Sequence, residues 1–166
     1  MRTILLIIFA SQLAYAAKPP PAPMLDAVHA AKEARIALCR MSVIDELQVV
    51  QGPRKLEAAE VRELADILGS ESSYKNDNLK KFCIVFWDFK VFLYDEKENR
   101  FVGVRICTTC NDIGMELNFD SKGGGELTAD AMSKLQVLFN RWFPEWRRVV
   151  RENRENRENR ENREKW

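Results

Sequence analysis

Residues Phe82 to Phe101 read FCIVFWDFKVFLYDEKENRF, and this segment is the strongest indication of fold class in the chain. It holds seven of the sixteen aromatic residues, mixed with Val and Ile, which is a composition typical of β-strands. Since alternate residues of a strand point to the same face of a sheet, one face should carry the odd-numbered residues. These residues are Cys83, Val85, Trp87, Phe89, Val91 and Leu93. The polar run Asp95 to Asn99 predicts a short connection to the next strand.

Further strands are predicted on both sides of this segment. Phe101 to Cys107 and Met115 to Phe119 both alternate apolar and polar residues, which is the pattern of half-buried strands. Ile36 to Val50 is rich in β-branched residues and predicts one or two more strands, closed by a turn at Gly52-Pro53. Successive strands with short connections favour an antiparallel meander.

Helices are predicted where apolar residues recur at helical spacing. Met24 to Arg35 is rich in Ala and predicts a short helix, and Leu56 to Leu68 predicts a second one that Gly69 ends. A third should run from its N-cap Thr128 to Trp142. The glycine run Gly123 to Gly125 predicts a flexible loop before it, because no Gly-Lys-Ser/Thr sequence of a phosphate-binding loop follows.

We therefore predict a single α+β domain from residue 24 to residue 150. It should be an antiparallel β-meander built around Phe82 to Phe119, with the helices Leu56–Leu68 and Thr128–Trp142 packed on one face. The chain has 26 basic and 25 acidic residues, so it lacks the strongly basic character of most nucleic-acid-binding domains, and no nucleic-acid partner is expected.

The N-terminus has the pattern of a secretory signal peptide over residues 1–16. A basic start at Met1-Arg2 precedes the apolar run ILLIIFA, and Ala14-Tyr15-Ala16 matches an A-x-A cleavage site. The apolar run is shorter than the roughly 20 residues that a membrane-spanning helix needs. Residues 17–23 follow as a Pro-rich spacer. We expect a soluble mature protein without a membrane anchor, exported to a periplasm or to the outside.

The C-terminal tail, residues 151–166, is of low complexity. It repeats Arg-Glu-Asn and ends in Glu164-Lys165-Trp166, with no apolar face to bury. Its charge pairs four residues apart run Arg before Glu, the weaker order, and Asn is a poor helix former. The tail is predicted to be a fraying helical extension or a disordered segment that folding does not require.

The cysteines Cys39, Cys83, Cys107 and Cys110 are the most specific chemical signal, with Cys107 and Cys110 forming a C-x-x-C. An even number of cysteines in an exported protein favours a structural disulfide, here between Cys83 and the C-x-x-C. The four cysteines are also candidate zinc ligands, although no second C-x-x-C completes a typical zinc site. A third interpretation is thiol–disulfide exchange at Cys83, Cys107 and Cys110, but the C-x-x-C lacks the helix N-terminus that lowers thiol pKa values in thioredoxin-like enzymes.

No other catalytic or cofactor-binding set stands out. His29 is the chain's one histidine, and no nucleophile or metalloprotease motif is present. Asp88 interrupts an apolar run, although acids near hairpins are usually solvated. The cluster of Trp142, Phe143 and Trp146 could contact a protein partner or pack back on the core.

Two of these segments carry a resemblance. CIVFWDFKV, starting at Cys83, and VRICTTC, ending at Cys110, resemble a pattern in uncharacterised small exported bacterial proteins, in which a strand-borne Cys precedes a strand that ends in C-x-x-C. The similar region runs from Leu56 to Phe143. In that pattern a Pro and a His follow the first Cys, whereas Trp87 and Asp88 stand in this region here. The resemblance implies the fold and export, and no activity.

The sequence thus predicts an exported, non-enzymatic structural or binding protein stabilised by a disulfide. The alternative is a thiol–disulfide or zinc-dependent activity centred on Cys107 and Cys110. The ligand, the partner and the oligomeric state are not encoded in any motif.

Overall fold

The computed structural model describes residues 19–41, 47–76, 87–95, 100–118 and 121–163. The predicted signal peptide and Cys83 lie outside these residues. The elements follow in the order α1 (Ala22–Ala30), β1 (Glu33–Met41), β2 (Leu47–Lys55), α2 (Ala58–Leu68), the 3₁₀ turn η2 (Glu71–Ser73), β3 (Phe89–Asp95), β4 (Arg100–Cys107), β5 (Asp112–Leu117), β6 (Ser121–Glu126), α3 (Ala129–Trp142) and α4 (Trp146–Arg163).

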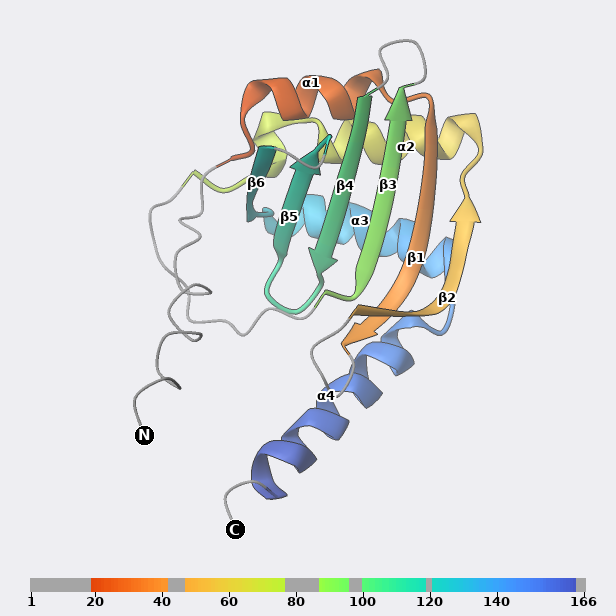
Figure 1. Ribbon diagram of the computed structural model, residues 1–166, viewed down its shortest axis with the longest axis vertical. Helices are drawn as coiled ribbons and strands as arrows, with labels where there is room; N and C mark the ends of the chain where they lie inside the picture. The colour runs from red at the N-terminus through yellow and green to blue at the C-terminus, as the bar shows by residue number, and fades with distance from the viewer. Residues whose placement is uncertain (1–18, 42–46, 77–86, 96–99, 119–120, 164–166) are drawn as a thin grey trace, which may run out of the picture.

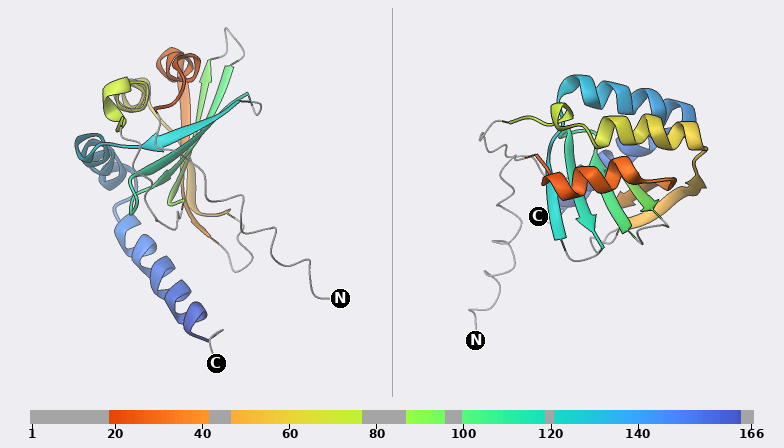
Figure 2. Two further views of the ribbon diagram at one scale, coloured as in Figure 1. Left: turned by 90° about the vertical axis from the view of Figure 1, so that its left-hand side faces the viewer. Right: turned by 90° about the horizontal axis from the view of Figure 1, so that it is seen from above.

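The six strands form one antiparallel sheet in the order β2-β1-β3-β4-β5-β6. The helices α1, α2 and α3 lie together on one face of it, and α4 extends away from the end of the sheet where β1 ends (Figures 1 and 2). The predicted α+β class, with an antiparallel meander and helices packed on one face, is confirmed. The strands β3 to β6 make the meander, and the β1–β2 hairpin extends it on the β3 side.

The core lies between the sheet and these helices. Phe89, Val91 and Leu93 on β3 are buried, as the alternation predicts. Phe89 stacks on Phe139 of α3 with 3.8 Å between ring centroids, and Trp146 of α4 lies 5.7 Å away. The aromatic density of the central segment therefore builds the contact between the sheet, α3 and the start of α4.

Trp87 does not share the face of Phe89, although the alternation predicts that it should. Its ring lies against Gly114 and under the guanidinium of Arg105, which belong to the opposite face of the sheet. The reason is that β3 begins only at Phe89, so Trp87 precedes the strand and is not bound by its alternation. The other two predicted members of that face, residues 83 and 85, lie outside the described residues.

The turn predicted at Gly52-Pro53 is wrong, because β2 continues through both residues to Lys55. A proline is tolerated there because β2 is an edge strand, so the missing N–H need not face a neighbouring strand. Gly52 has a φ of 100°, which a residue with a side chain rarely adopts, and the pairing with β1 is irregular at this point.

The loop predicted at Gly123 to Gly125 is also wrong, since these glycines form half of the edge strand β6. A Cβ on Gly124 would overlap the carbonyl oxygen of Ile113, and one on Gly123 would lie 3.0 Å from Pro21. The glycines are therefore needed for close packing of β6 against β5 and the start of α1, not for flexibility.

The helix predictions are close to the structure. The second helix starts at Ala58 with Glu57 and Glu60 as a capping box, and Thr128 caps α3 by accepting a hydrogen bond from the N–H of Ala131 at 3.2 Å. The first helix begins at Ala22, inside the predicted spacer, and ends at Ala30, so Arg35 belongs to β1.

The tail continues α4 as a helix to Arg163, which agrees with the helical alternative. At its start, the side chains of Trp146 and Val150 are only 4% and 5% exposed. Further along, the guanidinium of Arg154 donates a hydrogen bond to the hydroxyl of Thr109. Of the helices among the described residues, none has the length and hydropathy needed to cross a membrane.

Candidate functional site

The predicted cysteine cluster lies at the end of the sheet nearest α4. Cys39 on β1 donates its backbone N–H to the carbonyl oxygen of Asp88 at 2.8 Å, and Asp88 donates its own to Ile106 of β4 at 2.8 Å. Asp88 therefore sits between Cys39 and the β4 residues that precede the C-x-x-C. The side chains of Cys39 and Cys107 are 0% exposed, and that of Cys110 is 5% exposed.

The two cysteines of the C-x-x-C differ in state. Cys39 and Cys107 are outside any disulfide, whereas Cys110 is disulfide-bonded. Cys107 and Cys110 are thus not joined to each other, and the partner of Cys110 is not among the described residues.

The electrostatics of this cluster disfavour a reactive thiolate. Burial raises the pKa of the Cys39 thiol to about 11, and the nearby Asp88 carboxylate adds to the effect, while Lys90 opposes it. Burial also raises the pKa of Asp88, against the hydrogen bonds from Thr108 and the charge of Arg154. Cys39 is therefore protonated at neutral pH, unlike an activated nucleophile.

The zinc candidates are only partly placed. Within the described ranges, no three His, Cys, Asp or Glu side chains lie close enough together to hold a metal ion. Cys83, the fourth candidate, lies outside those ranges.

Asp88 is buried rather than solvated, with only 3% of the side chain exposed. One carboxylate oxygen, Oδ2, accepts hydrogen bonds from the backbone N–H of Thr108 at 2.8 Å and from its hydroxyl at 2.6 Å. Asp88 thereby anchors the turn that carries the C-x-x-C to β3. Asp88, which interrupts the apolar run in the sequence, therefore has a structural role.

The aromatic cluster considered for a protein partner is part of the core. Trp142, Phe143 and Trp146 are all buried. The indole N–H of Trp142 donates to Glu60 at 2.7 Å, and that of Trp146 donates to Asn140 at 2.8 Å. Their rings pack inward, as in the second interpretation, and do not form an exposed contact surface.

The sheet face opposite the helices α1, α2 and α3 carries a group of aromatic side chains that sequence reasoning missed. We call this face the open face, and its aromatic band consists of Trp87, Phe92, Tyr94 and Phe101. Phe101 stacks near Phe92 with 5.6 Å between ring centroids and lies 5.3 Å from Tyr94. The Phe101 ring rests on the backbone of Gly103, as the Trp87 ring rests on Gly114. An edge of each of these two rings therefore lies close to the backbone of the sheet.

Cations lie on five of the six strands of the open face. They are Lys55, Arg35, Lys90, Arg105 and Lys122, on β2, β1, β3, β4 and β6. Lys90 lies over the Phe92 ring at 4.8 Å, and Arg105 lies over the Trp87 ring at 5.1 Å. The register places four acids on the same face, Glu33, Asp112, Glu116 and Glu126. Glu33 pairs with Lys55 at 3.0 Å, and Glu116 is the register partner of Lys122.

Two pairs of these cations are direct neighbours across strands. Lys90 is the register partner of Arg105, and Arg35 is the register partner of Lys55. Like charges directly opposite each other destabilise a sheet. Among the described residues, Arg35, Lys90 and Arg105 have no carboxylate within 4.0 Å. The even-numbered alternation of Lys90, Phe92 and Tyr94 was visible in the sequence, but the strand register that places Lys90 opposite Arg105 was not.

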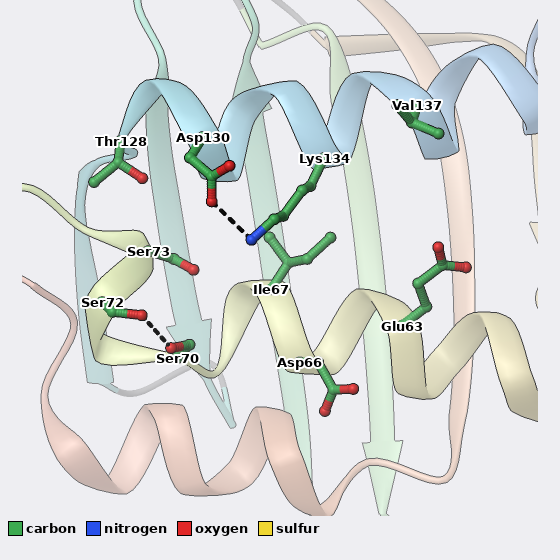
Figure 3. A pocket seen from close by; sticks show the side chains of 10 residues that line it. All are labelled: Glu63, Asp66, Ile67, Ser70, Ser72, Ser73, Thr128, Asp130, Lys134 and Val137. Carbon is green, nitrogen blue, oxygen red and sulfur yellow. Dashed lines mark hydrogen bonds and ion pairs between the residues drawn. The ribbon is translucent and has the colours of Figure 1, made fainter.

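A polar groove of about 380 Å³ lies on the outer surface between α2 and α3 (Figure 3). Its carboxylates are largely paired, since Asp130 binds Lys134 at 2.7 Å and Glu63 binds Arg141 at 2.8 Å. Ser70 and Ser72 hydrogen-bond to each other at 2.8 Å. The groove therefore offers a ligand little unsatisfied charge, in contrast to the open face.

Comparison with protein-family models finds no matching family, and searches of the curated proteins and of the solved structures find no similar protein. Export and the resemblance noted in the sequence thus stay predictions. A function can be inferred only from the residues and geometry of the site.

Proposed function

We propose that the chain is an exported, non-enzymatic binding protein whose ligand-binding surface is the open face, and that its ligand is anionic. The observation that carries the proposal is the presence of two like-charge register pairs, Lys90 opposite Arg105 and Arg35 opposite Lys55. Natural sequences tend to break local rules of stability where a function requires it. An anion bound between such cations would relieve their repulsion.

The aromatic band adds contact area beside these charges. Its side chains are half-buried apart from Tyr94, which is 37% exposed. Rigid aromatic surfaces next to cations are favourable for recognition, because they lose little conformational entropy on binding.

Export and a disulfide complete the proposal. Residues 1–16 have the sequence pattern of a signal peptide. We propose that Cys83 is the disulfide partner of Cys110, since Cys39 and Cys107 form no disulfide and the chain has four cysteines. Such a bridge would tie the segment before β3 to the turn after β4.

The alternative is thiol–disulfide exchange, favoured by the free thiol of Cys107 three positions before the disulfide-bonded Cys110. Both residues are nearly inaccessible, and the buried acid Asp88 is close by. These features oppose thiolate formation, so we rank this activity below binding.

The test is binding of anionic polymers to the purified protein at physiological salt. The panel contains polygalacturonate, a dT oligonucleotide and vesicles rich in phosphatidylglycerol. The open-face variant Lys90→Glu with Arg35→Glu should weaken binding of at least one probe by about tenfold or more. The control Arg62→Glu with Lys134→Glu makes the same change in net charge on the exposed surfaces of α2 and α3 and should leave binding unchanged. Equal binding by the open-face variant, or no binding of any probe, would contradict the proposal.

A further inference from the structure

We infer that the groove between α2 and α3 is a second binding site, and that it takes a neutral sugar, a small uncharged ring that carries several hydroxyl groups. The groove has a volume of about 380 Å³ and lies on the outer surface of the helices (Figure 3). Ligand pockets typically measure about 300–1,000 Å³, so this one would hold a single small ligand. It lies on the side of the sheet away from the open face, so the inference does not rest on the proposed function.

The observation that points to a ligand is the side chain of Ser73. The residue is only 8% exposed. Its backbone is satisfied, because its N–H donates to Ser70 at 3.0 Å and its carbonyl oxygen accepts from the N–H of Thr128 at 2.8 Å. Its hydroxyl has no hydrogen-bond partner within the part of the chain that the structure describes, and the oxygen points into the groove beside Ile67 (Figure 3). Buried hydroxyls are normally hydrogen-bonded, so this one is available to a molecule in the groove.

The charges around the groove favour an uncharged ligand. The described residues that line it include the carboxylates of Glu63, Asp66 and Asp130, which would repel an anion. Lys134, the cation among the described lining residues, is already bound to Asp130 at 2.7 Å. A cationic ligand would have to compete with this pair and with the pair of Glu63 and Arg141, while Asp66 points away from α3 (Figure 3). A neutral ligand meets neither obstacle.

Hydroxyl groups complement what the groove offers. Ser70 and Ser72 share one hydrogen bond at 2.8 Å, which leaves one of their two hydroxyl hydrogens to donate, and Ser73 has its full capacity left. A serine hydroxyl both donates and accepts, as a sugar hydroxyl does, whereas a carboxylate only accepts and an ammonium group only donates. Ile67 and the 58% exposed Val137 add apolar surface, against which the carbon-bound hydrogens of a sugar ring can lie.

The experiment follows the backbone amide signals of the purified protein by NMR during titration with single sugars. The neutral probes are glucose, galactose and N-acetylglucosamine, and glucuronate and glucosamine are the charged counterparts of the same ring. We expect at least one neutral sugar to shift the amide signals of Ser73 and Thr128, with a Kd of about 10 mM or tighter. The charged counterparts should bind at least about fivefold more weakly.

Ser73→Ala tests the residue that carries the inference. It should weaken sugar binding about fivefold, which is the loss expected for one hydrogen bond between uncharged groups. It should not lower the melting temperature, because the hydroxyl has no partner to lose among the described residues. Ser133→Ala is the matched control, since it removes an exposed hydroxyl of α3 outside the groove and should leave binding unchanged. Val137→Trp, which should fill the groove from its exposed side and prevent binding, is the second variant if Ser73→Ala folds poorly.

Each outcome decides for or against the inference. It fails if none of the three neutral sugars binds, or if Ser73→Ala and Val137→Trp both leave binding unchanged. Tighter binding of glucuronate or glucosamine would also overturn it, because the ligand would then be charged. A lower melting temperature of Ser73→Ala would show that the hydroxyl is bonded within the fold and is not available to a ligand. None of these outcomes bears on the anionic polymers of the proposed function, which are tested at the open face.

Discussion

Asp88 and Thr108 are joined by two hydrogen bonds that converge on a single oxygen, since the backbone N–H and the hydroxyl of Thr108 both donate to Oδ2 of Asp88. The pair holds the turn after β4 against the start of β3. Through it a carboxyl side chain fixes the backbone of the C-x-x-C turn.

Asp88→Ala should destabilise the protein by about 1–3 kcal/mol, because the half-buried donors of Thr108 lose their acceptor. Thr108→Val removes the hydroxyl and keeps the N–H, so it should cost less. Urea unfolding of both single variants and the double variant measures the coupling. If the two effects simply add, the hydrogen bonds do not couple the residues.

Asp88 should also make stability depend on pH. Burial raises its pKa in the folded state above the ordinary value of 3.8, so the folded protein holds the proton more tightly than the unfolded chain. Its contribution to stability is present at low pH and is lost as the pH rises from the unfolded pKa through the folded one. Asp88→Asn should flatten this part of the profile of unfolding free energy against pH. An unchanged profile would contradict the assignment.

Glu60 should act in the opposite direction. Burial alone would raise its pKa, but the N–H of Glu57, the indole of Trp142 and the guanidinium of Arg54 together lower it. Its contribution is therefore present above the unfolded pKa of 4.5 and is lost as the pH falls through the folded value. Glu60→Gln should cost about 1–3 kcal/mol at neutral pH and much less in acid. Glu63→Gln is the matched control, since its ion pair with Arg141 is exposed.

The contribution of the C-terminal helix to stability should come mainly from the residues up to Val150. Truncation after Val150 removes the hydrogen bond from Arg154 to Thr109 and no buried side chain described in the structure, so it should cost about 1 kcal/mol or less. Truncation after Glu145 also removes the buried Trp146 and Val150 and should cost at least about 3 kcal/mol. Thermal unfolding measures both, at roughly 2–4 °C per kcal/mol for a chain of this size. A large loss from the first truncation would place part of the repeat in the fold.

Thiol counting should find two reactive groups in the denatured protein without reductant and four after reduction. In the native protein, Cys39 and Cys107 should react slowly at neutral pH, because both are inaccessible and burial raises the pKa of Cys39 to about 11. Four thiols without reductant would rule out the proposed bridge between Cys83 and Cys110.

Sequence patterns correctly predicted the features that depend on residues close together in the chain. The alternation of Phe89, Val91 and Leu93, the stripe of α2 and the cap at Thr128 depend on residues close in the sequence, and all three are found in the structure. The glycines of β6 were mistaken for a loop because their role depends on Ile113 and Pro21, which no local pattern connects to them. The turn at Gly52-Pro53 failed for a similar reason, since an edge position is a property of the assembled sheet.

The candidate site was harder to predict than the fold. Cysteine spacing drew attention to Cys107 and Cys110, which are buried at one end of the sheet. The open face depends on register, because Lys90 meets Arg105 only after β3 and β4 pair. A charge contact between strands is visible in the sequence only when the turn that sets the register is known.

The irregular pairing of β2 around Gly52-Pro53 has a consequence for the behaviour of the protein in solution. An edge strand with a complete row of free N–H and C=O groups is a template on which other chains can add strands and aggregate. Pro53 has no N–H to offer, and the irregular pairing beside it bends the strand away from a straight edge. Val49 and Val50 are exposed on this strand and would otherwise favour such addition. The proline thus acts as a gatekeeper that limits growth of the sheet at β2.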